Sequence, residues 1–238
     1  WGPTVDMCRN PFWGRNEEAY GEDPYLTGIM ATSLINGVQE NGIGVCMGSL
    51  VCAEKEHNRN NYDARISERA LREIYLLPFE MAIKNADPWM LMTSYNRVNG
   101  RWAASNYDLT TRLLRNDFGF DGFVMTDWWA NINERGKSPD KSNFAAMVRA
   151  QNDLYMVVSD AASNPHEDDS QAALESGIIT RGDLVRNAKN IIRVSATATK
   201  VSHQEFYEIP EDEVINAGLI TRAIYVNEDV DEDIQITN

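Results

Sequence analysis

Short apolar runs alternate with longer stretches of helical period from residue 2 to about residue 194, and this alternation constrains the fold more than any other feature. Uninterrupted apolar runs are typical of strands that are buried on both faces of a parallel sheet. Parallel strands need long crossover connections, which the helical stretches between the runs supply. We therefore predict an α/β fold built from repeated strand–helix units. The predicted strands are residues 3–7, 44–52, 90–95, 122–126 and 154–158.

The stretches between these strands carry the signals that begin and interrupt helices. Glu22 and Asp23 precede one helical stretch and suit the positive end of a helix, and Ser67 is the predicted N-cap of another. Pro78 should kink that second helix, because proline lacks the amide hydrogen that the helix ladder requires. The predicted helices are residues 24–40, 67–86, 109–117, 143–151, 168–174 and 181–199.

Five predicted strands are too few for a closed eight-stranded barrel. We expect an incomplete (β/α) TIM-type barrel at residues 1–200, followed by an acidic C-terminal extension or linker at residues 201–238. Ten acidic residues and one basic residue lie between residues 203 and 238, so this segment carries −9 of the chain's formal charge of −14. An open sheet exposes unpaired strand edges, which predicts cover from the extension, from another chain or from self-association into a homo-oligomer.

The composition argues against several classes of partner. A formal charge of −14, from 36 acidic and 22 basic residues, repels nucleic acid and anionic membrane surfaces but not a neutral sugar. No apolar run approaches the roughly 20 residues that span a membrane, and the first residues do not form a signal peptide, which favours a cytoplasmic location. The chain begins abruptly at Trp1, as expected of a fragment or a trimmed chain.

Metal and cofactor chemistry lack the residue patterns that they need. His57, His166 and His203 are too far apart for zinc-type spacing, and no glycine-rich phosphate-binding loop opens a helix. The three cysteines are odd in number and have no metal-type spacing, so we expect reduced thiols rather than a disulfide framework. We predict no metal site and no cofactor.

Asp127 is the strongest candidate for chemistry. It follows the apolar run 122–126 at the C-terminal end of a predicted barrel strand, where such folds place their active sites, and Trp128 and Trp129 come directly after it. Aromatic faces suit the apolar side of a sugar ring, and an ionised carboxylate can attack an anomeric carbon or stabilise an oxocarbenium ion. The alternative for this motif alone is an aspartate that caps the next helix beside two core tryptophans.

Five strings, in the right order and at compatible spacings, resemble family 3 glycoside hydrolases over most of residues 1–200. Residues 146–156 (AMVRAQNDLYM) resemble the branch of that family in which the catalytic barrel follows the second domain. The resemblance implies a retaining, β-glucosidase-like hydrolase with a TIM barrel that acts in carbohydrate metabolism on β-glycosides or short oligosaccharides. The strings are residues 2–7 (GPTVDM) with 13–15 (WGR), 21–26 (GEDPYL), 67–76 (SERALREIYL), 92–96 (MTSYN) and 119–128 (GFDGFVMTDW).

The resemblance also implies roles for single residues. Asp127 matches the nucleophile that forms the covalent glycosyl-enzyme, and Arg15 matches an arginine that binds the sugar, although a surface salt bridge is its alternative role. Trp128 and Met92 match walls of the sugar subsite.

Two further side chains are predicted to face the site because each lies at or after the end of a predicted strand. Arg59 is on the loop that follows residues 44–52. Tyr95 ends the strand 90–95, where its hydroxyl could contact the nucleophile or the sugar, and a core tyrosine is the alternative.

The chain departs from the family beside this site. Residues 48–50 are Gly-Ser-Leu where the family usually has Lys-His-Phe, and Ala53 stands where an asparagine is common. The lost groups normally hydrogen-bond sugar hydroxyls, and losing one such donor can cost about 100-fold in rate. Ser49 occupies one of these positions and is retained as a predicted substrate-binding residue.

The resemblance further implies that the barrel's opening strands, with another sugar-binding aspartate, and a second domain that supplies the general acid/base lie outside this chain. Glu54, Glu56 and Glu134 could lie near the site, but no motif favours any of them. Two alternatives to the enzyme stay open. One is a catalytically silent barrel segment that binds carbohydrate or serves as an assembly scaffold, and the other is an engineered or recombined barrel fragment.

Overall fold

The structure is a computed structural model that describes residues 1–157, 160 and 163–205. The chain divides into two units, Trp1–Ala198 and Thr199–Asn238. The first unit contains every element described below except the last residues of one helix. The predicted acidic extension lies outside the described residues from position 206 onward.

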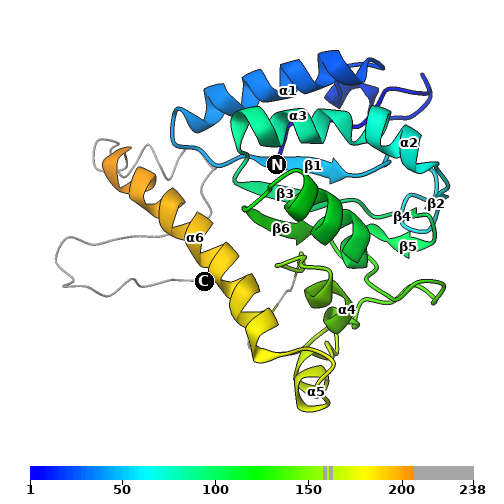
Figure 1. The fold of residues 1–238 in the computed structure, drawn as a ribbon, viewed down its shortest axis with the longest axis vertical. Helices are drawn as coiled ribbons and strands as arrows, with labels where there is room; N and C mark the ends of the chain where they lie inside the picture. The colour runs from blue at the N-terminus through cyan, green and yellow to red at the C-terminus, as the bar shows by residue number, and fades with distance from the viewer. Residues whose placement is uncertain (158–159, 161–162, 206–238) are drawn as a thin grey trace. The chain divides into compact units, whose positions relative to one another are not determined.

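Three parallel strands form the centre of the first unit, in the spatial order β1, β3, β6 (Figure 1). They are β1 (Cys46–Leu50), β3 (Met90–Thr93) and β6 (Phe123–Thr126). Met90 pairs with Cys46 on one side and with Phe123 on the other, so the three strands begin in register. All residues of β1 and β6 are buried, which explains why neither strand alternates between apolar and polar residues. The predicted α/β class is confirmed.

The first and last predicted strands were wrong, because both segments form isolated bridges instead of ladders. Gly2 and Thr4 each bridge to β1, and Leu154 bridges to β6. Pro3, between the first two, has no amide hydrogen to donate to a ladder. Next to Leu154, the carboxylate of Asp153 accepts a backbone N–H of β6 at 2.9 Å, so a side chain takes the place of a strand-to-strand hydrogen bond. The final position of that predicted strand lies outside the described residues.

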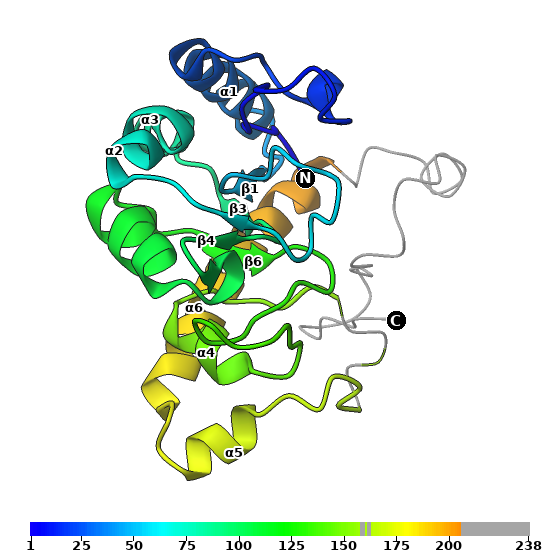
Figure 2. The ribbon, with the colours of Figure 1, turned by 90° about the vertical axis from the view of Figure 1, so that its right-hand side faces the viewer.

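One face of the sheet is covered by α1 (Pro24–Gln39), α3 (Leu77–Ala86) and the π-helical segment Asp108–Asp117, as Figures 1 and 2 show. The carboxylate of Asp23 accepts the backbone N–H groups of residues 25 and 26 at 2.8 and 3.0 Å, so α1 begins where the sequence predicts. The core between this layer and the sheet is apolar, and its largest fully buried members include Ile35, Leu76, Phe79, Leu91 and Leu114.

The helix predicted over residues 67–86 is divided into α2 (Glu68–Ala70), a π-helical segment (Leu71–Tyr75) and α3. The hydroxyl of Ser67 accepts the backbone N–H of Ala70 at 3.2 Å, which confirms the predicted N-cap. Pro78 lies in the first turn of α3, where its missing amide hydrogen costs least, so the break precedes the proline instead of centring on it.

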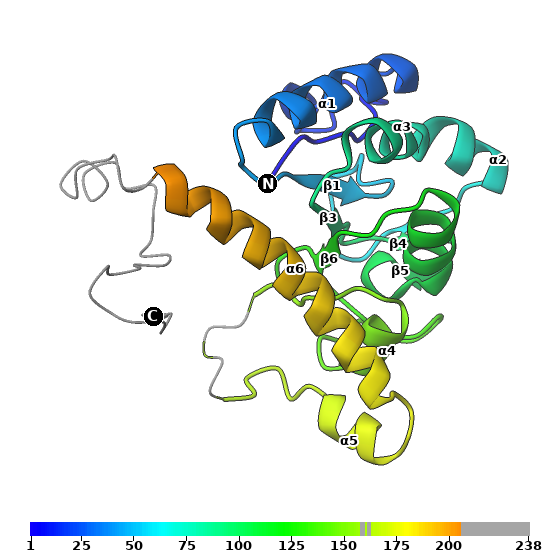
Figure 3. The ribbon, with the colours of Figure 1, turned by 60° about the vertical axis from the view of Figure 1, so that its left-hand side comes forward.

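The opposite face of the sheet is covered by the part of α6 (Arg181–Glu205) that belongs to the first unit, which Figure 3 shows on the other side of the strands from α1 and α3. Ile191 and Val194 of this helix belong to one apolar cluster with Cys46, Phe123 and Met125 of the strands. Helices α4 (Phe144–Arg149) and α5 (Ser170–Glu175) precede α6 and lie close to their predicted bounds. Two segments of the described chain, Asn16–Glu18 and Ala103–Ser105, each form one turn of 3₁₀ helix.

A second, small sheet was not predicted. It consists of β2 (Asp63–Ala64), β4 (Arg97–Val98) and β5 (Arg101–Trp102). Strands β4 and β5 form a hairpin through Asn99 and Gly100, whose φ angles of 50° and 84° are those of a two-residue turn of the Asn-Gly type. The dipeptide was therefore the signal in the sequence, and the strands are too short for hydrophobic periodicity to reveal them.

Candidate active site

Asp127 directly follows β6, at the C-terminal end of the parallel sheet. Its backbone N–H donates to the carbonyl of Thr93 at the end of β3 at 3.1 Å, which ties the two strand ends together. One carboxylate oxygen accepts the backbone N–H of Trp128 at 2.7 Å. The residue is 8% exposed, so the carboxylate is almost entirely withdrawn from water but remains held by a donor.

Burial raises the pKa of Asp127 above its usual value, because an ionised carboxylate is poorly solvated away from water. The N–H of Trp128, the hydroxyl of Tyr95 and the guanidinium groups of Arg59 and Arg15 all lower that pKa and so oppose the effect of burial. Tyr95 is the reciprocal partner, since burial and the charge of Asp127 both raise its own pKa and keep its phenol protonated as a donor. The site thus pairs a buried carboxylate with a neutral donor and two cations.

The two predicted arginines converge on one carboxylate. Glu56 lies 3.0 Å from Arg59 and 3.8 Å from Arg15, measured between carboxylate oxygen and guanidinium nitrogen. Arg59 also lies over the ring of Tyr95, 4.8 Å from its centroid. Arg15 makes a two-pronged contact with Glu18 at 2.7 and 3.1 Å, through a single 3₁₀ turn. Its predicted alternative role, an ion pair, is therefore present beside the site.

A small cavity gathers five of the predicted residues, namely Asp127, Arg15, Arg59, Tyr95 and Ser49. Its open volume of about 10 Å³ is that of a single water position. A sugar ring is larger than this volume, so it could enter only if side chains moved, and the side chain of Arg59 is more exposed (41%) than those of Arg15 and Glu56 (26% and 29%). The remaining lining residues are Ala53, Glu56, Tyr62 and Asn96.

Met92 and Trp128 do not line this cavity. Met92 belongs to the apolar cluster between the sheet and α6, with its terminal methyl 3.2 Å from where a side chain on Gly48 would begin. Trp128 is half-buried and packs edge-on against Trp1, with ring centroids 4.8 Å apart. Both residues adjoin the strand ends of the site, and their role as walls of a sugar subsite stays a prediction.

Sequence reasoning missed the importance of Asp6, which it quoted only as part of a motif. Asp6 is 3% exposed and accepts the backbone N–H groups of Ser49 and Ala53 at 2.9 and 3.1 Å. Burial raises its pKa to about 6, against the opposing effects of those two N–H groups and Arg15. The available signal was an acidic residue inside the predicted strand 3–7, which is unusual unless its charge has buried partners.

The three carboxylates that lacked a motif have different surroundings. Glu56 lines the cavity, as described above. Glu54 is beside Asp6, and burial first and the charge of Asp6 second raise its pKa to about 8. Glu134 forms an ion pair with Arg149 and does not line the cavity.

A larger groove of about 1030 Å³ adjoins the cavity and shares Glu56 and Tyr62 with it. It runs between the N-terminal segment and α2, and its wall includes Arg9, Phe12 and Glu54. A volume of this size is ordinary for a ligand-binding cleft, so the cramped cavity lies next to open space.

Metal ligands are not clustered in the part of the chain that the structure describes, where no group of three or more histidine, cysteine or acidic side chains could hold an ion. Over the same residues, no helix is long and apolar enough to cross a membrane. The three cysteines are free, and burial raises the pKa of the Cys46 thiol to about 12 and that of Cys52 well above its usual value. Neither buried thiol is a reactive thiolate.

Comparison with known proteins places this arrangement in context. A β-glucosidase of Ruminococcus albus is 47% identical over 212 residues, which are 87% of this chain and 22% of that protein. A crystal structure of a β-glucosidase from Paenibacillus barengoltzii matches with a TM-score of 0.81 and 47% identity over 84% of this chain and 22% of that one. β-Glucosidase 3B of Thermotoga neapolitana in complex with glucose matches with a TM-score of 0.77 and 36% identity, over 91% and 29% of the two chains.

The chain thus spans between a fifth and a third of the length of these relatives. The family model described as the glycosyl hydrolase family 3 N terminal domain matches residues 1–194, which is most of the chain. Together with the parallel sheet and the buried aspartate at its C-terminal edge, this match shows that the chain belongs to glycosyl hydrolase family 3.

Proposed function

We propose that this chain carries the nucleophile of a retaining glycoside hydrolase that releases terminal β-linked glucose, or a closely similar sugar, from β-glycosides or short oligosaccharides. The observation that carries the proposal is Asp127, a buried carboxylate at the C-terminal end of β6 with Tyr95, Arg15 and Arg59 around it. Relatives that are named β-glucosidases, one of them bound to glucose, support the choice of reaction and sugar.

In the proposed reaction a carboxylate oxygen of Asp127 bonds to the anomeric carbon as the glycosidic C–O bond breaks. A separate carboxyl group protonates the departing oxygen. Water then attacks the same carbon, releases Asp127 as the carboxylate and gives its proton to the group that acted as the acid. The hydroxyl of Tyr95 and the N–H of Trp128 hold the carboxylate before attack. Arg15 and Arg59 supply positive charge and hydrogen bonds for sugar hydroxyls.

The acid/base is proposed to come from outside the described residues, from a second domain or from further strands of the barrel. Glu56, which lines the cavity, is already engaged by two arginines. Cover by additional chain, or by a second copy, is supported by α1, which has an exposed apolar side of five residues: Tyr25, Leu26, Ile29, Met30 and Leu34. The three-stranded sheet would then be one part of a barrel whose remaining strands come from that additional chain.

A second candidate function is a catalytically silent carbohydrate-binding or scaffold segment. Gly48, Ser49 and Ala53 supply few hydrogen-bond donors where the family usually has Lys, His and Asn, and the open volume at Asp127 is that of one water. These observations lower the expected rate without removing the nucleophile, so the two functions differ in whether Asp127 can be glycosylated.

The deciding experiment incubates the purified chain with 2-deoxy-2-fluoroglucosyl fluoride and weighs the intact protein by mass spectrometry. A parallel assay measures turnover of p-nitrophenyl β-glucoside, with the β-xyloside and the N-acetyl-β-glucosaminide as alternatives for the sugar. A single adduct that maps to Asp127 by peptide digestion supports the enzyme. A chain that is folded by circular dichroism and binds glucose by NMR but forms no adduct would support the silent function instead.

A further inference from the structure

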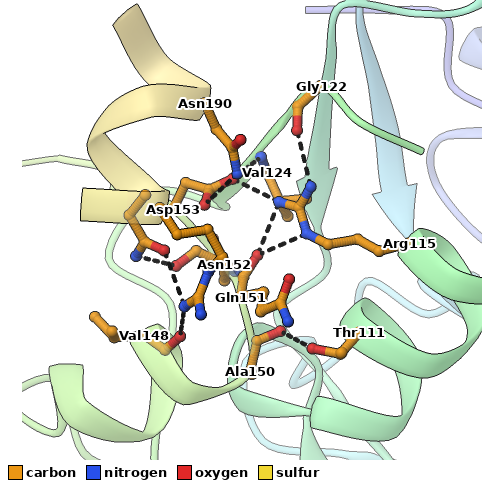
Figure 4. A network of polar contacts seen from close by, with 12 residues as sticks. Thr111, Arg115, Gly122, Val124, Val148, Ala150, Gln151, Asn152, Asp153 and Asn190 are labelled. Atoms are coloured by element: carbon orange, nitrogen blue, oxygen red, sulfur yellow. Dashed lines mark hydrogen bonds and ion pairs between the residues drawn. The ribbon is translucent and has the colours of Figure 1, made fainter. Parts of the chain in front are cut away.

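The segment that replaces the predicted fifth strand contains two buried polar residues, Asn152 and Asp153, which are 0% and 6% exposed (Figure 4). Burying an amide and a carboxylate is unfavourable unless their hydrogen bonds are met by the protein. Both side chains contact the strands that end at the candidate active site. Neither of them lines the cavity at Asp127, so contact with a sugar does not account for their burial.

Asp153 fixes β6. One of its carboxylate oxygens accepts the backbone N–H of Val124 at 2.9 Å and a guanidinium N–H of Arg115 at 2.6 Å. The other accepts the side-chain N–H of Asn190 on α6 at 3.0 Å. Arg115 donates further to the carbonyls of Gly122 and Gln151, each at 3.0 Å, so both ends of the ion pair are attached to the backbone around β6 (Figure 4).

Asn152 acts on the neighbouring strand. Its side-chain amide donates to the hydroxyl of Thr93 at 3.1 Å, and that hydroxyl donates to the carbonyl of Met125 at 3.3 Å. The carbonyl of the same Thr93 accepts the backbone N–H of Asp127 at 3.1 Å. Asn152 is therefore separated from the backbone of Asp127 by a single residue, and the hydroxyl in between joins β3 to β6.

The amide of Asn152 is oriented at a cost. Its nitrogen donates to Thr93 and also to the carbonyl of Ala104 at 3.2 Å, while its oxygen has no partner among the described residues. A buried acceptor without a partner is unfavourable. Two buried carbonyl or hydroxyl acceptors are satisfied in return, which indicates that donation toward β3 is the function of this side chain.

We propose that Asn152 is a positioning residue for the nucleophile, which sets the backbone of Asp127 through the Thr93 hydroxyl while Asp153 holds the start of β6. This inference rests on the proposed function only for its effect on rate. The placement of Asp127 itself is a structural property and is measurable without any turnover. A displacement of about 1 Å at a reacting group can cost on the order of 100-fold in rate, so a buried anchor one residue removed from Asp127 is sufficient to matter.

The test compares Asn152→Ala with Asn187→Ala. Asn187 is also a buried asparagine on the same network, but its side chain donates to the backbone carbonyl of Asn152 and does not reach Thr93. Hydrogen exchange of the Asp127 amide, followed by NMR and corrected for global stability in urea, reports the anchor. A ¹³C titration of the Asp127 carboxyl reports its surroundings.

We expect the corrected protection factor of the Asp127 amide to fall at least 10-fold in Asn152→Ala and less than 3-fold in Asn187→Ala. Thr93→Val should lower the protection factor as Asn152→Ala does, whereas Thr93→Ser, which keeps the hydroxyl, should retain the wild-type value. The double variant Asn152→Ala with Thr93→Val should lose no more protection than either single variant. Equal losses in Asn152→Ala and Asn187→Ala, or an unchanged amide in Thr93→Val, would overturn the inference.

Rate measurements then separate the two proposals. If the wild-type chain forms the fluoroglucosyl adduct, Asn152→Ala should slow adduct formation 10- to 100-fold with little change in sugar affinity. If the wild-type chain forms no adduct while the amide exchange follows the expected order, the proposed function fails and the positioning of Asp127 stands. If the wild-type chain forms the adduct and the exchange shows no difference between the asparagine variants, the positioning inference fails alone.

Discussion

The two strand ends that face the candidate cavity are held in different ways. Strand β6 leads into Asp127 and is held by buried side chains: Asp153 with Arg115 near its start, and Asn152 through Thr93 of the neighbouring strand near its end. The loop after β1 is held mainly by one buried carboxylate, Asp6, and it presents small side chains where donors are usual. The comparison teaches that the support of Asp127 and the support of the loop after β1 are structurally separable in this chain.

The largest expected effect comes from removing the carboxylate that follows β6. Asp127→Ala should abolish labelling by 2-deoxy-2-fluoroglucosyl fluoride, with a loss on the order of 10⁴-fold or more, because the proposed function assigns the attacking oxygen to this carboxylate. Mass spectrometry of the intact chain measures it. Asp121→Ala is the matched control, since that carboxylate precedes β6 but is exposed and pairs with Arg193 at the surface. Labelling that survives in Asp127→Ala would assign the nucleophile elsewhere.

The next effect concerns the buried ion pair that supports β6. Arg115→Ala should lower the free energy of unfolding by about 3–5 kcal/mol, because it leaves the fully buried side chain of Asp153 without its counter-charge. Arg193→Ala, which removes an ion pair between half-exposed or more exposed side chains, should cost about 0–1 kcal/mol. Urea denaturation measures both. Similar losses in the two variants would mean that the network around Asp153 is not a special support.

The next prediction adds a hydrogen-bond donor at the end of β1. Ser49→His should raise the rate of adduct formation by about 10- to 100-fold, because Ser49 lines the cavity at a position where the family usually has a sugar-binding histidine. Ser49→Ala is the control and should give no gain. Labelling kinetics under identical sugar concentrations check the prediction. A gain of the same size in Ser49→Ala would mean that loss of the serine hydroxyl raises the rate, and it would contradict the restored hydrogen bond.

The smallest effect tests the carboxylate next to the loop after β1. The folded pKa of Glu54 is raised to about 8 by burial and by Asp6, well above its value of roughly 4.3 in an unfolded chain. Stability that is present below pH 4 is therefore lost as the pH rises toward and through 8. Glu54→Gln should flatten this dependence and raise stability at pH 8.

Thermal melts between pH 5 and pH 8.5 measure the dependence on pH. Asp6, with a pKa of about 6, contributes in the same direction and remains in the variant, so part of the slope below pH 7 should persist. Glu73→Gln is the control, because that exposed carboxylate pairs with Arg69 on a helix surface. A wild-type chain whose stability rises between pH 5 and pH 8 would contradict the burial of Glu54.

Much of the fold was predictable because its signals are local. Asp23 and Ser67 cap helices through hydrogen bonds to N–H groups two or three residues away, so their positions in the sequence sufficed. Strands β1 and β6 are buried on both faces and β3 is buried on one face and partly buried on the other, which favours apolar runs in the sequence. The fifth predicted strand was wrong because its pairing depends on a long-range contact. The carboxylate of Asp153 accepts a backbone N–H of β6 that a strand would otherwise use, and sequence periodicity does not reveal such a contact.

The candidate site divides in the same way. Asp127, Arg15, Arg59 and Tyr95 were nominated by motifs and by their places after strands, and the structure brings them to one cavity. The partners of Asp6 and of Glu56 were not predictable. Those of Asp6 are backbone groups more than 40 residues away, and Glu56 is contacted by two arginines that converge only in the fold.

The sequence by itself determined the α/β class, the family and the identity of the buried carboxylate, because apolar periodicity, capping residues and motif strings are written in neighbouring positions. Only the tertiary structure decided how that carboxylate is held and how much room lies in front of it. Its surroundings are built from side chains that meet across strands, such as Asn152 on Thr93 and Asp6 on the loop after β1. Buried polar contacts of this kind depend on geometry at the level of single hydrogen bonds, which sequence spacing does not encode.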